Sequence, residues 1–76
     1  MLAEWVGSVE AAGGLVVVRT APGSAHLVAV ALDAGADGAV AGTIAGDDTV
    51  FLAVRTTASA EGVAQRLRAL AGVDEA

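Results

Sequence analysis

The sequence predicts an α+β domain with elements in the order β-β-α-β-β-α, most simply a four-stranded antiparallel sheet with two helices on one face. Three observations support this order. Two apolar segments flank a glycine turn near the N-terminus, a proline opens a helical segment, and a second apolar pair precedes an amphipathic C-terminal segment. The 76 residues are the size of one domain, so we expect residues 1–76 to form a single domain.

The first two strands should pair across a glycine turn. Residues 2–10 alternate loosely between apolar and polar, which predicts a half-buried strand with Trp5, Gly7 and Val9 on one side. A turn over residues 11–14 follows. Residues 15–18 are leucine and valine and end at an arginine, which indicates a more deeply buried strand that pairs antiparallel with the first.

A helix should follow, starting at Pro22 and running to about Ala34, because proline is favoured in the first helical turn. Thr20 or Ala21 would then be the cap residue, and Gly35 would end the helix. The residues expected to face the sheet are Leu27, Val28, Ala31 and Leu32.

The same helix carries a stripe that could line a polar pocket. His26, Val30 and Asp33 stand at i, i+4 and i+7, which places them on one side of a helix. Alternatively, Asp33 is an ordinary charge near a helix end and His26 is solvated or makes a single hydrogen bond. A hydrolase triad with Ser24 is excluded, because residues two apart on a helix point to nearly opposite sides.

The third and fourth strands should span residues 39–45 and 49–54 and form a tight hairpin. A loop over residues 55–58 leads to Ser59, which is expected to cap the last helix. In that helix Val63, Leu67 and Leu70 should face inward, while Gln65, Arg66 and Arg68 should face water.

The hairpin turn carries two adjacent carboxylates, Asp47 and Asp48, after Gly46. Neighbouring negative charges repel wherever they are partly covered from water, so a covered turn should hold something cationic. The alternative is a solvated polar turn that binds nothing. A Mg²⁺ or Ca²⁺ site is also conceivable, since carboxylate oxygens are hard ligands. A phosphate-binding loop is excluded, because no lysine follows Gly46.

Composition favours self-association. Hydrophobic residues make up 55% of the chain, more than so small a domain can bury alone. The sequence has no cysteine and one histidine, so neither a disulfide nor a histidine-based zinc site can supply the missing stability. Both predicted helices cover the same sheet face, so the apolar residues of the other face need a partner subunit.

The net charge argues against two kinds of partner. Nine carboxylates against four arginines give −5, and such a surface repels phosphate groups of nucleic acids and anionic membranes. No apolar run approaches the ~20 residues needed to cross a bilayer, and the N-terminus lacks a basic segment before an apolar core. We therefore expect a cytoplasmic protein without membrane contact.

Two stretches carry a family resemblance. GTIAGDDT at residues 42–49, preceded by RTAPGSAHLVAVALD at residues 19–33, resembles the C-terminal domain of bacterial arginine repressors. The resemblance covers about residues 15–54 at motif level. It implies a domain that binds the corepressor L-arginine, with no other cofactor. It also implies a homotrimer, two of which stack into a hexamer with arginine at their interface.

The resemblance also implies a ligand site. Asp47 and Asp48 match the paired aspartates that contact the cationic groups of arginine, and Asp33 matches a pocket aspartate on the helix. Thr43 and Ala45 match positions beside the ligand on the strand before the turn.

Other features depart from the family pattern. His26 stands where glutamine is common, and Arg19 where other members can carry histidine; the role of Arg19 stays open. Family members carry an N-terminal winged-helix domain that binds operator DNA, and nothing before Leu2 could be one. We therefore expect an isolated C-terminal domain, or a short protein that keeps the sensor alone. Alternative hypotheses are a structural trimerisation module without ligand and a metal-dependent enzyme built on Asp47 and Asp48.

Overall fold

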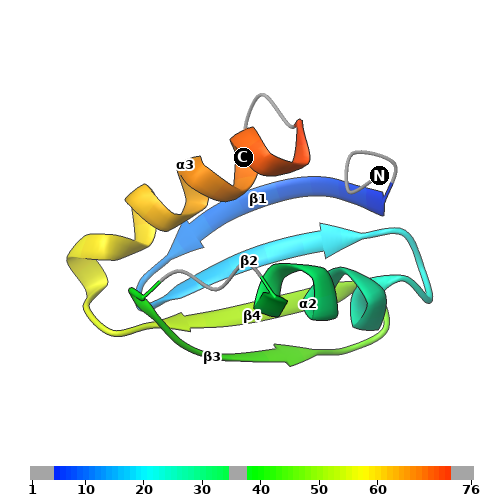
Figure 1. Cartoon of the computed structure of the whole chain (residues 1–76), viewed down its shortest axis with the longest axis horizontal. Coiled ribbons are helices and arrows are strands. Elements are labelled where there is room, and N and C mark those ends of the chain that lie inside the picture. The colour runs from blue at the N-terminus through cyan, green and yellow to red at the C-terminus, as the bar shows by residue number, and fades with distance from the viewer. Residues whose placement is uncertain (1–4, 35–37, 73–76) are drawn as a thin grey trace.

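The computed structural model describes residues 5–34 and 38–72, and the side chains of Asp33 and Ala34 fall outside this description (Figure 1). The order β-β-α-β-β-α is confirmed. The elements are β1 (Val6–Ala12), β2 (Leu15–Thr20), α2 (Ala25–Ala34), β3 (Val40–Ala45), β4 (Thr49–Val54), a 3-10 turn (Thr57–Ser59) and α3 (Ala60–Ala71).

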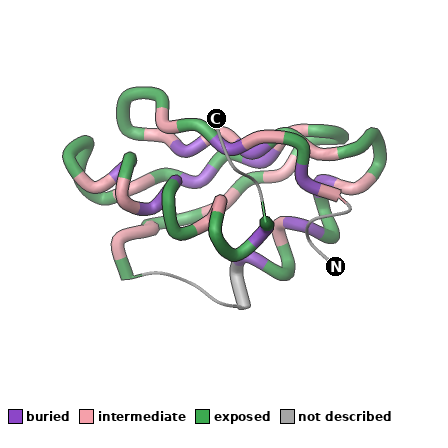
Figure 2. The backbone as a smooth tube through the Cα atoms, turned by 90° about the horizontal axis from the view of Figure 1, so that it is seen from above, coloured by how far each residue is buried: buried purple, intermediate pink, exposed green. Residues whose placement is uncertain are grey.

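The four strands form one antiparallel sheet in the order β1-β2-β4-β3. Val18 lies opposite Val50, and Val16 opposite Leu52. All four are buried and therefore share one face of the sheet. Both helices cover this face, as predicted: α3 packs on β1 and β2, and α2 packs mainly on β3 and β4. In Figure 2 buried and exposed segments alternate along the strands.

The predicted alternation along β1 is wrong around Gly7, because the strand contains a bulge there. The register shifts between Val6 and Ser8, and this irregularity lets Val6 and Val9, an odd number of residues apart, both be buried. Gly7, predicted to face inward with Val9, is exposed. Trp5 is partly buried and packs against the core, as expected.

The buried side of α2 is only partly the predicted one, since Val28 and Leu32 are buried as expected but Leu27 and Ala31 are not. Ala25, Val28 and Leu32 are buried, a stripe at i, i+3 and i+7. Leu27, predicted to face the sheet, is 54% exposed, and Ala31 is exposed as well. The helix is turned about its axis relative to the prediction, so an apolar edge of α2 faces outward.

The predicted inner side of α3 is only partly correct. Val63 is buried and Leu67 packs against the core, but Leu70 is 60% exposed, and Ala71 is buried instead. The buried line of α3 runs through Ala60, Ala64, Leu67 and Ala71, at i, i+4, i+7 and i+11. Val63 lies at one edge of this line, and Leu70, seven residues later on the same side, falls just outside it.

The start of α3 also differs from the prediction. Ser59 precedes the helix, yet its hydroxyl makes no cap bond and instead donates to the Thr56 carbonyl (2.8 Å). The expected loop before the helix contains the 3-10 turn.

Arg68 was expected to face water, but its side chain is only 15% exposed. Its Nε donates to the Val9 carbonyl (2.9 Å) on the edge strand β1, and its Nη1 pairs with a Glu61 carboxylate oxygen (3.0 Å). The arginine therefore ties α3 to β1.

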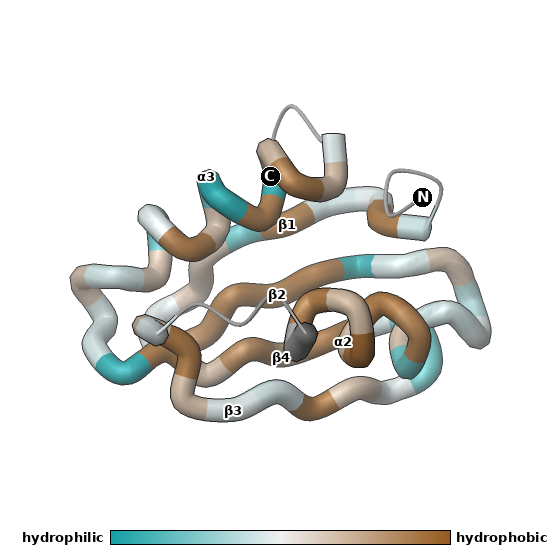
Figure 3. The backbone as a smooth tube through the Cα atoms, viewed as in Figure 1, coloured by the Kyte–Doolittle hydropathy of each residue, from teal (hydrophilic) through white to brown (hydrophobic). Residues whose placement is uncertain are grey.

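The sheet face opposite the helices carries an apolar row. The row consists of Val17, Phe51 and Ile44, and we call this surface the open face. These residues lie opposite one another across β2, β4 and β3. Ile44 is 74% and Phe51 44% exposed. Figure 3 shows hydrophobic segments along β2, β4 and α2. Among the described residues, no helix is long and apolar enough to cross a membrane.

We predict that Arg68→Ala lowers the free energy of unfolding by about 1–2 kcal/mol, because a part-buried carbonyl loses its charged donor. The matched control is Glu61→Ala, which removes only the exposed ion pair and should cost less than about 0.5 kcal/mol. Urea unfolding followed by circular dichroism measures both. Equal losses in the two variants would assign the stabilisation to the ion pair instead.

Candidate functional site

A tight turn sets where α2 begins. The Ser24 amide donates to the Ala21 carbonyl (3.0 Å), Pro22 takes the second position and Gly23 the third with φ of 80°, the signature of a type II turn. The left-handed Gly23 cannot belong to a helix, so α2 starts at Ala25 and not at Pro22. The residue before the helix is Ser24, rather than Thr20 or Ala21 at the cap.

Main-chain hydrogen bonds join this turn to the β3–β4 hairpin. The Asp47 carbonyl accepts from the amides of Gly23 (3.0 Å) and Ala25 (3.2 Å), and the Asp48 carbonyl accepts from the Thr20 amide (2.8 Å). The backbone of the two aspartates is thus held against the start of α2, which leaves both carboxylates available for other contacts.

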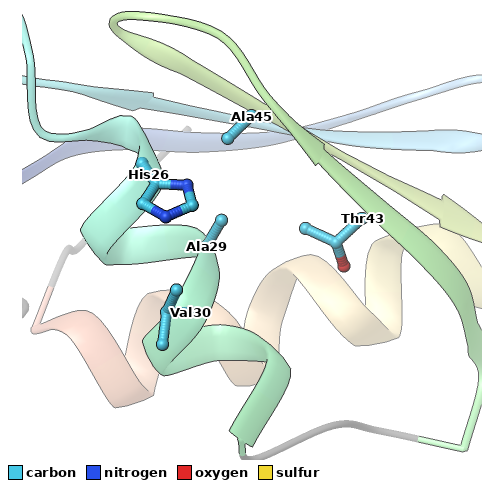
Figure 4. A pocket seen from close by; sticks show the side chains of 5 residues that line it. All are labelled: His26, Ala29, Val30, Thr43 and Ala45. Atoms are coloured by element: carbon cyan, nitrogen blue, oxygen red, sulfur yellow. The ribbon is translucent and has the colours of Figure 1, made fainter.

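A pocket of about 200 Å³ lies between α2 and β3. His26, Ala29 and Val30 line it from the helix, and Thr43 and Ala45 line it from the strand. Figure 4 shows these five side chains around the space between the two elements. The arrangement follows from local periodicity, since residues two apart on a strand and three or four apart on a helix share a side.

Three of the predicted site residues therefore meet in this pocket: His26, Thr43 and Ala45. The side chain of Asp33 lies outside the described residues; its backbone belongs to α2, seven positions after His26. Sequence reasoning missed Ala29, which the helical spacing from His26 could have identified.

Asp47 and Asp48 border the pocket without lining it. Both are exposed, and they follow Ala45 directly after one glycine. The Asp47 carbonyl bonds the amide of Ala25, the residue before His26. One Asp48 carboxylate oxygen accepts from the Thr49 hydroxyl (3.0 Å). The site so formed combines an apolar wall, two hydrogen-bonding side chains and two exposed negative charges, which suits a cationic ligand.

The described residues contain no cluster of side chains that could bind a metal ion. Within ranges 5–34 and 38–72, no three histidine, cysteine, aspartate or glutamate side chains gather closely enough to hold one. The hypothesis of a metal-dependent enzyme on Asp47 and Asp48 therefore has no ligand set in this part of the chain.

A second hollow, of about 220 Å³, lies on the other side of the same hairpin. Its lining comprises Ile44, Ala45, Gly46, Thr49 and Phe51. Ile44 and Phe51 belong to the open face, so this hollow is part of the apolar surface that the helices leave uncovered.

Comparison with known families decides what kind of domain carries this site. The family model described as "Arginine repressor, C-terminal domain" matches residues 2–69. The chain belongs to this family. The predicted resemblance to the C-terminal domain of arginine repressors is thereby confirmed.

Curated relatives agree with this assignment. The chain is 43% identical over 63 residues to an arginine repressor of Alkaliphilus oremlandii, covering 83% of this chain and 42% of that protein. It is 43% identical over 67 residues to an arginine repressor of Desulforudis audaxviator (88% and 45%). A relative in Thermotoga petrophila is 39% identical over 66 residues (87% and 43%). The chain thus spans less than half the length of these relatives.

We predict that Gly23→Ala lowers the free energy of unfolding by about 1 kcal/mol or more, because alanine is strained at a φ of 80°. The control is Gly14→Ala. Gly14 lies outside the left-handed region, and an added Cβ there meets no atom within 4 Å, so the change should stay within about 0.5 kcal/mol. Thermal unfolding measures both; equal effects would contradict the role of the turn.

Proposed function

We propose that this chain is the corepressor-sensing and oligomerisation domain of an arginine repressor and binds L-arginine at the α2–β3 pocket. One observation carries the proposal. The motif at residues 42–49 forms a strand and turn whose Thr43 and Ala45 line the pocket opposite His26, while Asp47 and Asp48 stand exposed beside it.

The chemistry of arginine suits this arrangement. The ligand carries a guanidinium, an α-ammonium and a carboxylate, with net charge +1. Asp47 and Asp48 contact the two cationic groups, for which charge-assisted hydrogen bonds to carboxylates are the strongest recognition available. The Thr43 hydroxyl and the His26 ring supply neutral hydrogen bonds, and Asp33 contributes from the later part of α2. The aliphatic part of arginine packs on Ala29 and Val30.

A single subunit leaves this site open to solvent. The aspartates are exposed, and Leu27 and Val30 on the outer edge of α2 are 54% and 57% exposed. A second subunit placed over α2 would bury these apolar side chains and exclude water around the ligand, which strengthens every charged contact. In this proposal the covering subunit belongs to another trimer, and arginine lies between two stacked trimers of a hexamer.

The trimer itself forms through the open face. A contiguous exposed apolar surface on a small soluble domain usually marks an interaction site, and here Ile44 and Phe51 flank the second hollow. Burial of this row in a homotrimer supplies the stability that the small core cannot.

Arginine then acts by linkage. A ligand that binds the assembled state more tightly than the separated state stabilises the assembly. In a longer repressor, a winged-helix domain N-terminal to this one would contact operator DNA, and assembly would favour its DNA-competent arrangement. The outcome is cytoplasmic control of genes for arginine biosynthesis or catabolism.

A structural trimerisation module without ligand is the second candidate. The open face favours it, because that surface is formed by the side of the sheet opposite the pocket and does not require the pocket to be occupied.

We predict that Asp47→Asn and Asp48→Asn each weaken L-arginine binding at least tenfold, because each replaces a charge-assisted contact by a neutral one. Isothermal titration measures the affinity, with L-lysine as a ligand that lacks the guanidinium. The wild-type chain should bind close to one arginine per chain.

The matched control is Glu61→Gln, which makes the same change of charge on α3, away from the pocket, and should leave the affinity unchanged. Sedimentation should find the same trimer in all three variants. An absence of heat with wild type at millimolar arginine would leave the structural trimerisation module as the function.

We also predict that Ile44→Glu abolishes trimer formation while the subunit stays folded, because it places a charge in the apolar interface that the open face is proposed to form. Analytical ultracentrifugation should find monomers, and circular dichroism should retain the helical and strand signals. Leu70→Glu is the control, since it changes another largely exposed apolar residue, on α3 (60% against 74% for Ile44). A trimer that survives Ile44→Glu would place the interface elsewhere.

A further inference from the structure

His26 differs from every other side chain that lines the α2–β3 pocket. Its partners there are Ala29, Val30, Thr43 and Ala45, none of which can gain or lose a proton near neutral pH. Imidazole changes charge between about pH 7.5 and 5.5. Among the five lining side chains, the ring of His26, labelled in Figure 4, is the one that can carry a charge.

The surroundings of the ring contain few other charges. On α2, the described side chains of residues 25–32 include no further ionisable group. From β3, Thr43 and Ala45 face the ring, and neither titrates. The β3–β4 turn contributes Asp47 and Asp48, both exposed. Of the side-chain types at this site, imidazole is the one whose charge ordinarily responds to pH near neutrality.

We propose that His26 makes arginine binding proton-sensitive: the pocket takes the cationic ligand with a neutral imidazole and releases the proton of His26 when it binds. This inference rests on the proposed function. An imidazolium in a pocket of about 200 Å³ repels a ligand of net charge +1, and the protonated ring has no acceptor nitrogen left for a ligand N–H.

The proton balance is simple. At a pH where part of the chains carry imidazolium, binding transfers that proton to the buffer, and no covalent bond changes. Thermodynamic linkage then requires that acid weakens arginine binding and that arginine makes His26 harder to protonate. If the protonated form is excluded, the dissociation constant rises about tenfold between pH 7.5 and 5.5.

The test compares wild type with His26→Gln, in which a neutral amide replaces the ring. Isothermal titration of L-arginine at pH 7.5 and 5.5 gives the ratio of dissociation constants at the two pH values for each protein. We expect a ratio of about ten for wild type and below about two for the variant. The comparison uses ratios, so an altered affinity of the variant at pH 7.5 does not affect it.

A second readout needs no variant. Because the chain has one histidine, its imidazole resonances in an NMR titration belong to His26. Saturating arginine should lower the midpoint of this titration by about one pH unit or more. The NMR titration tests the role of His26 even if the His26→Gln variant does not bind arginine at all.

The outcomes separate the two proposals. Binding at pH 7.5 with the same pH ratio in both proteins, or with an unmoved imidazole midpoint, overturns the role of His26 and leaves arginine sensing intact. No binding by wild type at pH 7.5 overturns arginine sensing, and the proton coupling with it.

Discussion

Three main-chain hydrogen bonds join the acidic hairpin turn to the end of β2 and the start of α2, and the position of the site depends on them. The amides of Thr20, Gly23 and Ala25 donate to the carbonyls of Asp48 and Asp47. Because the donors and acceptors are backbone groups, the turn stays in place without using its side chains. This constraint sets the distance between the helix and β3, and thereby creates the space that His26, Thr43 and Ala45 line.

The strand β3 then serves two surfaces at once. Thr43 and Ala45 face α2 and the pocket, whereas Ile44 between them faces the open side of the sheet with Phe51. Alternation along a strand makes this division unavoidable. A ligand that shifts β3 against α2 also shifts a residue of the surface through which we propose that subunits associate. The pocket and the proposed subunit interface therefore lie on the two sides of the same strand.

The sequence predicted the fold and brought three of the five residues that line the α2–β3 pocket into its candidate site, because both depend on short-range patterns. β4 occupies the predicted residues 49–54, since turn residues precede it and an arginine follows it. Alternation places Thr43 and Ala45 together, and helical spacing adds His26.

Other features depend on information that a pattern does not carry. The predicted start of α2 at Pro22 was wrong, because proline can either open a helix or occupy the second position of a type II turn. The positive φ of Gly23 shows that the turn is formed here. The bulge at Gly7 and the partly buried Arg68 depend on the final packing of β1 against α3. The contacts of the Asp47 and Asp48 carboxylates stay a prediction, because exposed side chains take their orientation from a partner.

The packing of the two helices divides the domain into unlike halves. α3 rests on β1 and β2 and is tied to the edge strand by Arg68, whereas α2 rests on β3 and β4. Cooperative units that open separately often follow such divisions. If arginine occupies the α2–β3 pocket as proposed, it contacts the half with α2 and not the half with α3. Amide exchange should then slow on ligand binding in α2 and β3 more than in α3.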